Sequence, residues 1–272
     1  GGTVLNVYTG ELLPQNVAVT GGRISYVGVE SRGVESGTRI LDVSGKWLVP
    51  GYVDPHFHPW FIYNPVSFGE AASARGITTL FCDNLIFYML MGIERFEAFM
   101  ETLQGLPVTY YWWARAVPQT PMEDEADLFS TAHIQRLLSH PRVQSVGEIT
   151  RWQKLVRGSA ALQEIIRYAK ALKKRVDGHT AGARWDHLVA LAGAGVESCH
   201  ESIHGDEVVE RLRLGMYAML RESSLRQDLR ELLQKVRREG LLTDRITLTT
   251  DCSSPAFYEK HGINDRLIRI AL

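Results

Sequence analysis

Two histidines separated by one residue are the side chains of this 272-residue chain with the clearest chemical potential. His56 and His58 follow the apolar stretch Gly51–Val53. Alternate side chains of a β-strand point to the same side, so both imidazoles would face one place. Two nitrogen ligands on one rigid edge suit a borderline divalent metal. Taken alone, the pair could equally be two surface histidines or a structural pair, so the rest of the chain must decide.

The elements that would position this pair follow a repeated pattern. From residue 47 onward, short apolar runs alternate with helical segments such as 161–174 and 205–214, which is typical of β-strand and α-helix units. Eight candidate strands are found, at residues 47–53, 78–82, 108–113, 143–146, 175–177, 195–198, 216–220 and 246–250. Eight is the number that closes a (β/α)8 barrel, the TIM-like α/β fold. We expect this barrel over residues 49–272 and a small β-unit over residues 1–48, where β-prone runs alternate with turn signals.

Polar residues follow several of these strands, and the active site of such a barrel lies at the carboxyl ends of its strands. Besides the histidine pair, they are Glu148 after the fourth strand, His179 after the fifth, His200 and Glu201 after the sixth, and Asp251 after the eighth. Any one of them could have a structural role, as a helix cap or an ordinary loop residue. Together at one end of one barrel, they predict a metal-binding catalytic site.

Composition narrows the class of partner. The 30 basic and 31 acidic residues give a formal charge of −1, so no excess of positive charge indicates a nucleic acid partner. No run approaches the roughly 18 apolar residues of a membrane span. Three cysteines at distant positions, without a CxxC pair, favour a reducing compartment over a disulfide framework. We expect a cytoplasmic protein with no nucleic acid or membrane partner, which could form a homo-oligomer.

The two ends of the chain look incomplete. It begins at Gly1 without an initiator methionine, and it ends in the apolar helical pattern of residues 267–272 without a stop signal. We expect a barrel truncated near its last helix.

The chain resembles the metal-dependent amidohydrolase superfamily and, within it, the adenine deaminase family. The similarity runs through nearly the whole chain. It rests on Pro50–His58, Val146–Glu148, Asp177–Gly182, the pair His200 and Glu201, and Arg211–Ser224 followed by Thr249–Asp251.

The resemblance implies a role for each strand-end residue. His56, His58 and Asp251 would hold one divalent metal ion, His179 and His200 a second, and Glu148 would bridge them; the ions would be manganese, iron or zinc. The implied reaction, part of purine metabolism, is hydrolytic deamination of adenine to hypoxanthine and ammonia by a metal-activated hydroxide. Asp251 would carry the proton, and Glu201 would contact the purine ring. A carboxylate can serve two such cations, which agrees independently with this arrangement.

Two segments depart from the family pattern. Residues 59–62 read Pro-Trp-Phe-Ile and residues 83–86 read Asp-Asn-Leu-Ile, where the family carries Ile-Glu-Ser-Ser and Asp-Pro-His-Glu. A drier or differently shaped pocket is expected. Trp60, Trp152 and Asn84 are candidate substrate-binding residues; each tryptophan lies just past a predicted ligand and could stack on a heterocycle, although packing under a loop would explain it equally well.

Two other functions stay open at this point. The chain could hydrolyse a cyclic amide or another amino-heterocycle on the same metal scaffold, or it could be a catalytically inactive, truncated binding module. The complete set of six predicted metal ligands argues against the inactive module.

Overall fold

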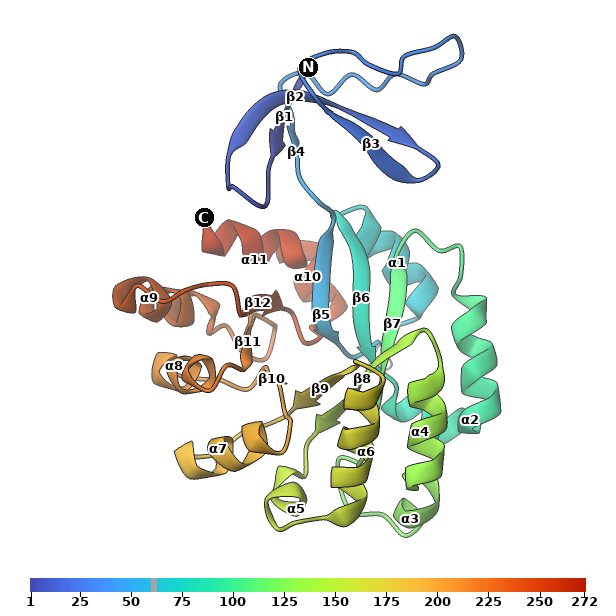
Figure 1. The fold of residues 1–272 in the computed structure, drawn as a ribbon, viewed down its shortest axis with the longest axis vertical. Coiled ribbons are helices and arrows are strands. Elements are labelled where there is room, and N and C mark those ends of the chain that lie inside the picture. Colours follow the sequence, from blue (N-terminus) through green and yellow to red (C-terminus); the bar gives the residue numbers. More distant parts are fainter. Residues whose placement is uncertain (60–62) are drawn as a thin grey trace. The chain divides into compact units, whose positions relative to one another are not determined.

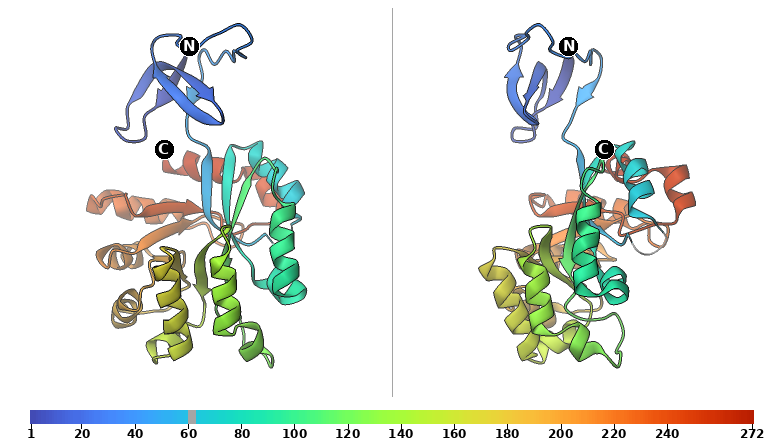
Figure 2. Two further views of the ribbon diagram at one scale, coloured as in Figure 1. Left: turned by 45° about the vertical axis from the view of Figure 1, so that its right-hand side comes forward. Right: turned by 90° about the vertical axis from the view of Figure 1, so that its right-hand side faces the viewer.

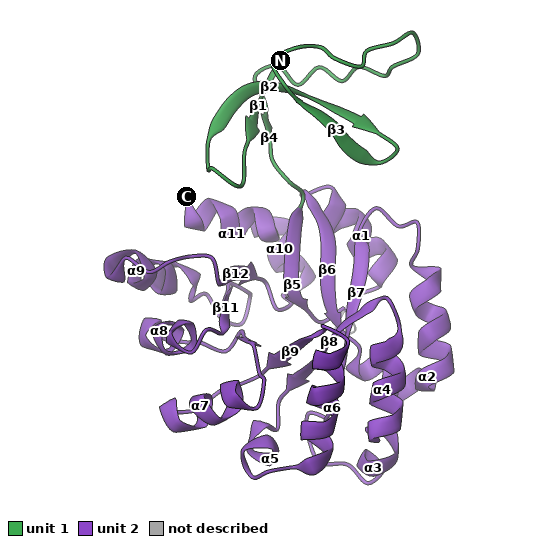
Figure 3. Ribbon diagram, in the orientation of Figure 1, with its two compact units in different colours: residues 1–51 green, residues 52–272 purple. Residues whose placement is uncertain are grey.

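The computed structural model describes residues 1–59 and 63–272 (Figure 1). The contacts between residues divide the chain into two compact units, Gly1–Gly51 and Tyr52–Leu272 (Figure 3). Trp60, one of the predicted substrate-binding residues, lies outside the described residues.

The first unit is a small four-stranded sheet in the order β3-β2-β1-β4. Its strands are β1 (Gly2–Leu5), β2 (Leu12–Thr20), β3 (Arg23–Gly28) and β4 (Trp47–Leu48). β1 pairs antiparallel with β2 and parallel with β4. The prediction of one strand over residues 47–53 is therefore wrong: Trp47 and Leu48 join this sheet, and the barrel strand starts at Tyr52. Pro50 and Gly51 lie between the two, and proline cannot donate a hydrogen bond to a sheet.

The described residues of the second unit form eight parallel strands in chain order. They are β5 (Tyr52–Phe57), β6 (Ile77–Asp83), β7 (Thr109–Ala114), β8 (Val143–Ile149), β9 (Arg175–Gly178), β10 (Ser198–Cys199), β11 (Tyr217–Arg221) and β12 (Ile246–Thr249). Helices follow the strands and lie outside them in all three ribbon views (Figures 1 and 2). The predicted eight-stranded α/β barrel is confirmed.

The helices described in the second unit lie between successive strands, except the last two, which follow the last strand. They are α1 (Pro65–Ser73), α2 (Leu85–Thr102), α3 (Glu125–Leu128), α4 (Thr131–Ser139), α5 (Trp152–Val156), α6 (Ala160–Ala171), α7 (Trp185–Gly193), α8 (Gly205–Arg213), α9 (Leu229–Glu239), α10 (Pro255–His261) and α11 (Asn264–Ala271). Among the described residues, no helix is both long enough and apolar enough to span a membrane.

Side-chain hydrogen bonds join the first and last strands of the barrel. Within the described chain, backbone ladders link neighbouring strands from β5 to β12 but not β12 to β5. The buried Asp54 carboxylate accepts hydrogen bonds there from Thr249 Oγ1 at 2.7 Å and from Thr250 Oγ1 at 2.9 Å. We call Asp54, Thr249 and Thr250 the seam. Because Asp54 lies two residues before His56, and Thr250 directly before Asp251, the seam fixes the relative position of the two strands that lead to these residues.

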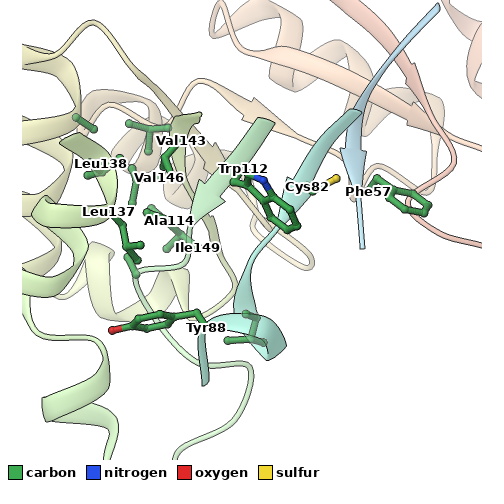
Figure 4. Close-up of a cluster of buried hydrophobic side chains, with 14 of the residues drawn as sticks. Phe57, Cys82, Tyr88, Trp112, Ala114, Leu137, Leu138, Val143, Val146 and Ile149 are labelled. Carbon is green, nitrogen blue, oxygen red and sulfur yellow. The ribbon is translucent and has the colours of Figure 1, made fainter. Parts of the chain in front are cut away.

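Two apolar clusters support the strands. The larger packs β5–β9 against the helices around them, and Figure 4 shows part of it, including Trp112, Leu137, Val146 and Ile149. The smaller consists of seven buried residues from α8, β11, α9 and α11. Interdigitated apolar packing of this kind resists changes of shape and so holds the strand ends rigidly.

Candidate metal centre

The six predicted metal ligands come together at the carboxyl ends of the barrel strands. His56 lies inside β5 and His58 just beyond it, while Asp251 follows β12. Asp251 Oδ1 lies 3.2 Å from His56 Nε2 and 3.0 Å from His58 Nε2. One carboxylate oxygen thus faces both imidazoles of the His-x-His pair.

Glu148 lies between two groups of histidines. Its Oε2 is 2.8 Å from His179 Nδ1 and 3.2 Å from His200 Nε2. Its Oε1 is directed to the other group and lies 3.9 Å from His58 Nε2. The two oxygens of this carboxylate, only 3% exposed as a residue, therefore face two different places where an ion could bind.

The donor atoms fit divalent metals. Two groups, His56–His58–Glu148 and Glu148–His179–His200, each bring their ligand atoms within 4.8 Å of one another. Within the described part of the chain, His56 Nε2, His200 Nδ1 and Asp251 Oδ1 are buried without a hydrogen-bond partner. Buried polar atoms without a partner cost free energy. A metal ion would satisfy two of these atoms directly, His56 Nε2 and Asp251 Oδ1. Imidazole and carboxylate together suit zinc, manganese and iron.

Further carboxylates support the His-x-His pair from behind. Asp83 Oδ2 lies 3.1 Å from His58 Nδ1, and Asp177 Oδ2 lies 3.2 Å from His56 Nδ1. Such partners orient a ligating imidazole and raise its basicity. Burial alone would lower the pKa of both rings, but Asp251 together with these carboxylates raises the pKa of His56 to about 9 and that of His58 to about 10.

Two arginines pair with the carboxylates of the site, and neither was predicted from the sequence as a site residue. Arg115 Nη1 lies 2.6 Å from Glu148 Oε1, and Arg221 Nη1 lies 2.5 Å from Asp251 Oδ2. Burial would raise the pKa of Glu148, but Arg115 and the facing histidines hold it well below its usual value. Their positions in the sequence could have indicated both arginines, because Arg115 directly follows β7 and Arg221 is the last residue of β11. The active site of such a barrel lies at the carboxyl ends of its strands.

The backbone at Asp251 is unusual. Asp251 has φ 54° and Cys252 has φ 95°, in the left-handed backbone region that residues other than glycine rarely adopt. The Asp251 amide donates to Thr249 Oγ1 at 3.0 Å, which helps to hold this conformation. Burial would raise the pKa of Asp251, but the facing imidazoles of His56 and His58 keep it well below its usual value. Strain of this kind clusters at functional sites.

A cavity of about 460 Å³ opens at this end of the barrel. The candidate metal ligands except His56 line one part of it, together with Glu201 and Arg221. Apolar side chains that line it include Leu85, Ile86 and Leu225. The cavity thus joins a charged wall of candidate metal ligands to apolar surface, as expected for a small heterocycle.

The structure does not bring Asn84 and Trp152 to the described lining of this cavity. Asn84 is fully buried, and its Oδ1 accepts a hydrogen bond from the Arg115 amide at 3.0 Å. The Trp152 indole nitrogen donates to the Ala181 carbonyl at 3.2 Å, and its ring packs against His187. Both side chains therefore support the loops around the site.

With the barrel and its cluster described, comparison with known proteins places the chain in a family. The model of the amidohydrolase family matches residues 47–268. The chain belongs to this family, and the family predicted from the sequence is confirmed.

Among curated proteins, one of Halalkalibacterium halodurans named "Putative adenine deaminase" is 40% identical over 99% of this chain and 47% of its own length. An adenine deaminase of Moorella thermoacetica is 30% identical over 100% of this chain and 46% of its own length. The chain thus spans about half the length of the curated relatives it matches.

Solved structures show the same fold at low sequence identity. N-acetyl-D-glucosamine-6-phosphate deacetylase from Mycobacterium smegmatis superposes with a TM-score of 0.57 at 15% identity, covering 99% of this chain and 80% of that one. A β-aspartyl dipeptidase from Fervidobacterium islandicum also gives a TM-score of 0.57, at 16% identity, covering 92% of this chain and 72% of that one.

Proposed function

We propose that this chain carries the catalytic barrel of a metal-dependent aminohydrolase that converts adenine to hypoxanthine and ammonia. The observation that carries the proposal is the position of Glu148, which lines the cavity and whose two oxygens face two groups of histidines. Relatives named as adenine deaminases match nearly the whole chain, and their names suggest adenine as the substrate.

Each residue of the cluster has an assigned place. His56, His58 and Asp251 would hold one divalent ion, His179 and His200 a second, and Glu148 would lie between them. When bound, such ions act as Lewis acids and lower the pKa of water, which supplies a nucleophile at neutral pH.

Asp251 moves the proton in this proposal. Its low pKa leaves it ionised, so it can accept a proton from the attacking water at Oδ1 or Oδ2. Arg221, 2.5 Å from Oδ2, keeps the carboxylate directed into the cavity. Asp251 then returns the proton to the amino group as this group leaves.

The overall reaction balances with adenine and one water. The water oxygen forms a bond to C6 and the bond between C6 and the amino nitrogen breaks. One water proton leaves on the ammonia and the other remains on the ring, which becomes hypoxanthine. Glu201, which lines the cavity beside His200, is assigned the contact to the ring nitrogen that gains this proton.

The test is product formation from adenine by chain loaded with Mn(II) or Zn(II) in separate samples. We expect hypoxanthine and ammonia in equal amounts, both absent after chelation. Folded chain with metal bound but no hypoxanthine would contradict adenine as the substrate.

Two hydrogen bonds to Glu201 favour a second candidate function, hydrolysis of a cyclic amide. Both oxygens of Glu201 are held by arginines, Oε1 by Arg221 at 3.0 Å and Oε2 by Arg226 at 2.9 Å. A carboxylate engaged on both sides has less freedom to contact a purine ring, whereas Arg221 could donate to a carbonyl. A Glu201→Gln variant separates the two functions: loss of adenine turnover supports the deaminase, and unchanged turnover of a cyclic amide such as dihydrouracil supports the alternative.

A further inference from the structure

Arg115 is an unusual neighbour for a carboxylate that is expected to bridge two metals. It is only 1% exposed, and three side-chain acceptors fix its guanidinium: Glu148 Oε1 at 2.6 Å, Asp83 Oδ2 at 3.2 Å and Gln119 Oε1 at 2.6 Å. A buried guanidinium with this many partners cannot leave without stranding a charge, which is strongly destabilising. Arg115 is therefore a fixed part of the site.

The oxygen that Arg115 holds is the one that a bridge requires. Glu148 Oε2 already faces His179 and His200. Oε1 is the oxygen directed toward His58, but it lies 3.9 Å from the His58 nitrogen and 2.6 Å from the arginine. A positive charge at this distance competes directly with a cation for the same oxygen.

The two places for an ion also differ in their surroundings. We call His56, His58 and Asp251 the first position, and His179, His200 and Glu148 the second position. In the first, Asp177 and Asp83 stand behind the two imidazoles. In the second, the described residues place no carboxylate on the far nitrogen of either ring, and His200 Nδ1 is buried without a partner. Partners of this kind typically change metal affinity by about 10- to 100-fold.

We propose that Arg115 prevents Glu148 from bridging, so that the two positions fill in order, the first tightly and the second weakly. Arg115 is a positioning residue, because it acts through Glu148. The proposal rests on the metal-dependent function proposed above and adds which ion is held tightly and what sets the difference. It concerns metal binding alone, so its test needs no substrate.

The test is a titration of metal-free chain with Mn(II), followed by calorimetry and by metal analysis after dialysis. For the unaltered chain we expect one tightly held ion and a second whose affinity is lower by about tenfold or more. In Arg115→Met we expect the gap between the two affinities to narrow by about tenfold or more, because Oε1 becomes free to bridge. In Arg115→Lys the charge remains, so the gap should persist.

A matched control is Arg136→Met, because Arg136 also pairs with two carboxylates, Glu94 and Glu97, but at the surface. It should leave both affinities unchanged. Two ions bound with equal affinity by the unaltered chain would overturn the proposal even if Arg115→Met fails to fold, as would a gap that Arg115→Met does not alter. A folded chain that binds no ion would contradict the metal-dependent function itself, which is a distinguishable result.

Discussion

The Glu148 side and the Asp251 side of the site are positioned by different forces. On the Glu148 side, β8 is packed into the larger apolar cluster by Val146 and Ile149, which flank Gly147 and Glu148 (Figure 4). On the Asp251 side, β12 is only partly buried, and the hydrogen bonds of the seam tie it to β5.

This difference indicates what a substitution on each side would change, stability or the geometry of the site. Apolar packing holds a strand by shape, so its loss costs stability first and leaves the chemistry of the folded molecules intact. Hydrogen bonds to a single buried carboxylate are directional and so set the orientation of a strand. Their loss should therefore disturb the geometry of the site and lower the stability of the protein together. Variants on the two sides should therefore separate stability from turnover.

The largest effect is expected at the Asp251 side itself. Asp251→Asn keeps the shape of the side chain but removes the group assigned to carry the proton, so turnover should fall by about 10²- to 10⁴-fold. Ammonia release from adenine measures it, with Asp206→Asn as a control at an exposed carboxylate. Near-normal turnover in Asp251→Asn would refute the assigned role.

On the Glu148 side, Leu137→Ala removes a fully buried side chain that packs in the larger cluster. The cavity that remains should lower the free energy of unfolding by about 2–5 kcal/mol. Urea denaturation measures this loss, and turnover per folded molecule should stay within about twofold. A large loss of turnover in fully folded protein would show that packing here also adjusts the chemistry.

At the seam, Asp54→Asn should lower both the free energy of unfolding and the turnover of adenine. An amide has one acceptor oxygen where the carboxylate offers two, so the bonds from Thr249 and Thr250 cannot all be retained. We expect about 1–3 kcal/mol less stability to urea and reduced adenine turnover, because β5 and β12 position candidate ligands of the same metal position. Reduced stability with full turnover would show that the seam does not align the site.

The smallest effect is expected far from both sides, at the exposed pairs of Arg136 with Glu94 and Glu97. Arg136→Ala should change the free energy of unfolding by no more than about 1 kcal/mol, because solvent screens such pairs. Thermal unfolding with and without added salt measures it. A larger loss would mean that surface charge between α2 and α4 contributes as much as the buried seam.

The sequence predicted the elements that repeat. Strand and helix alternation located the barrel, and the position of polar residues after strands selected Glu148, His179 and Asp251, which the structure brings together. The first strand was misplaced because residues 47–53 form one apolar run, although Trp47 and Leu48 pair with β1. Periodicity cannot show which sheet a short strand joins.

Contacts between side chains were harder to predict. Arg115 and Arg221 were not predicted because histidine and carboxylate are the usual metal ligands, although Arg115 directly follows β7 and Arg221 is the last residue of β11. Asn84 was expected in the pocket because residues 83–86 depart from the family pattern, and Trp152 because it lies just past Glu148 in the chain. Their hydrogen bonds to Arg115 and Ala181 instead support the surrounding loops. A cytoplasmic location, the absence of a nucleic acid partner and a homo-oligomer stay predictions.

The most direct test of the central claim is anomalous diffraction from crystals of the chain loaded with Zn(II) and measured at the zinc absorption edge. The account predicts an anomalous peak about 2.0–2.2 Å from His56 Nε2, His58 Nε2 and Asp251 Oδ1. A weaker peak is expected beside His179, His200 and Glu148. Peaks confined to other parts of the chain, or no peak in crystals whose zinc content is established, would contradict it.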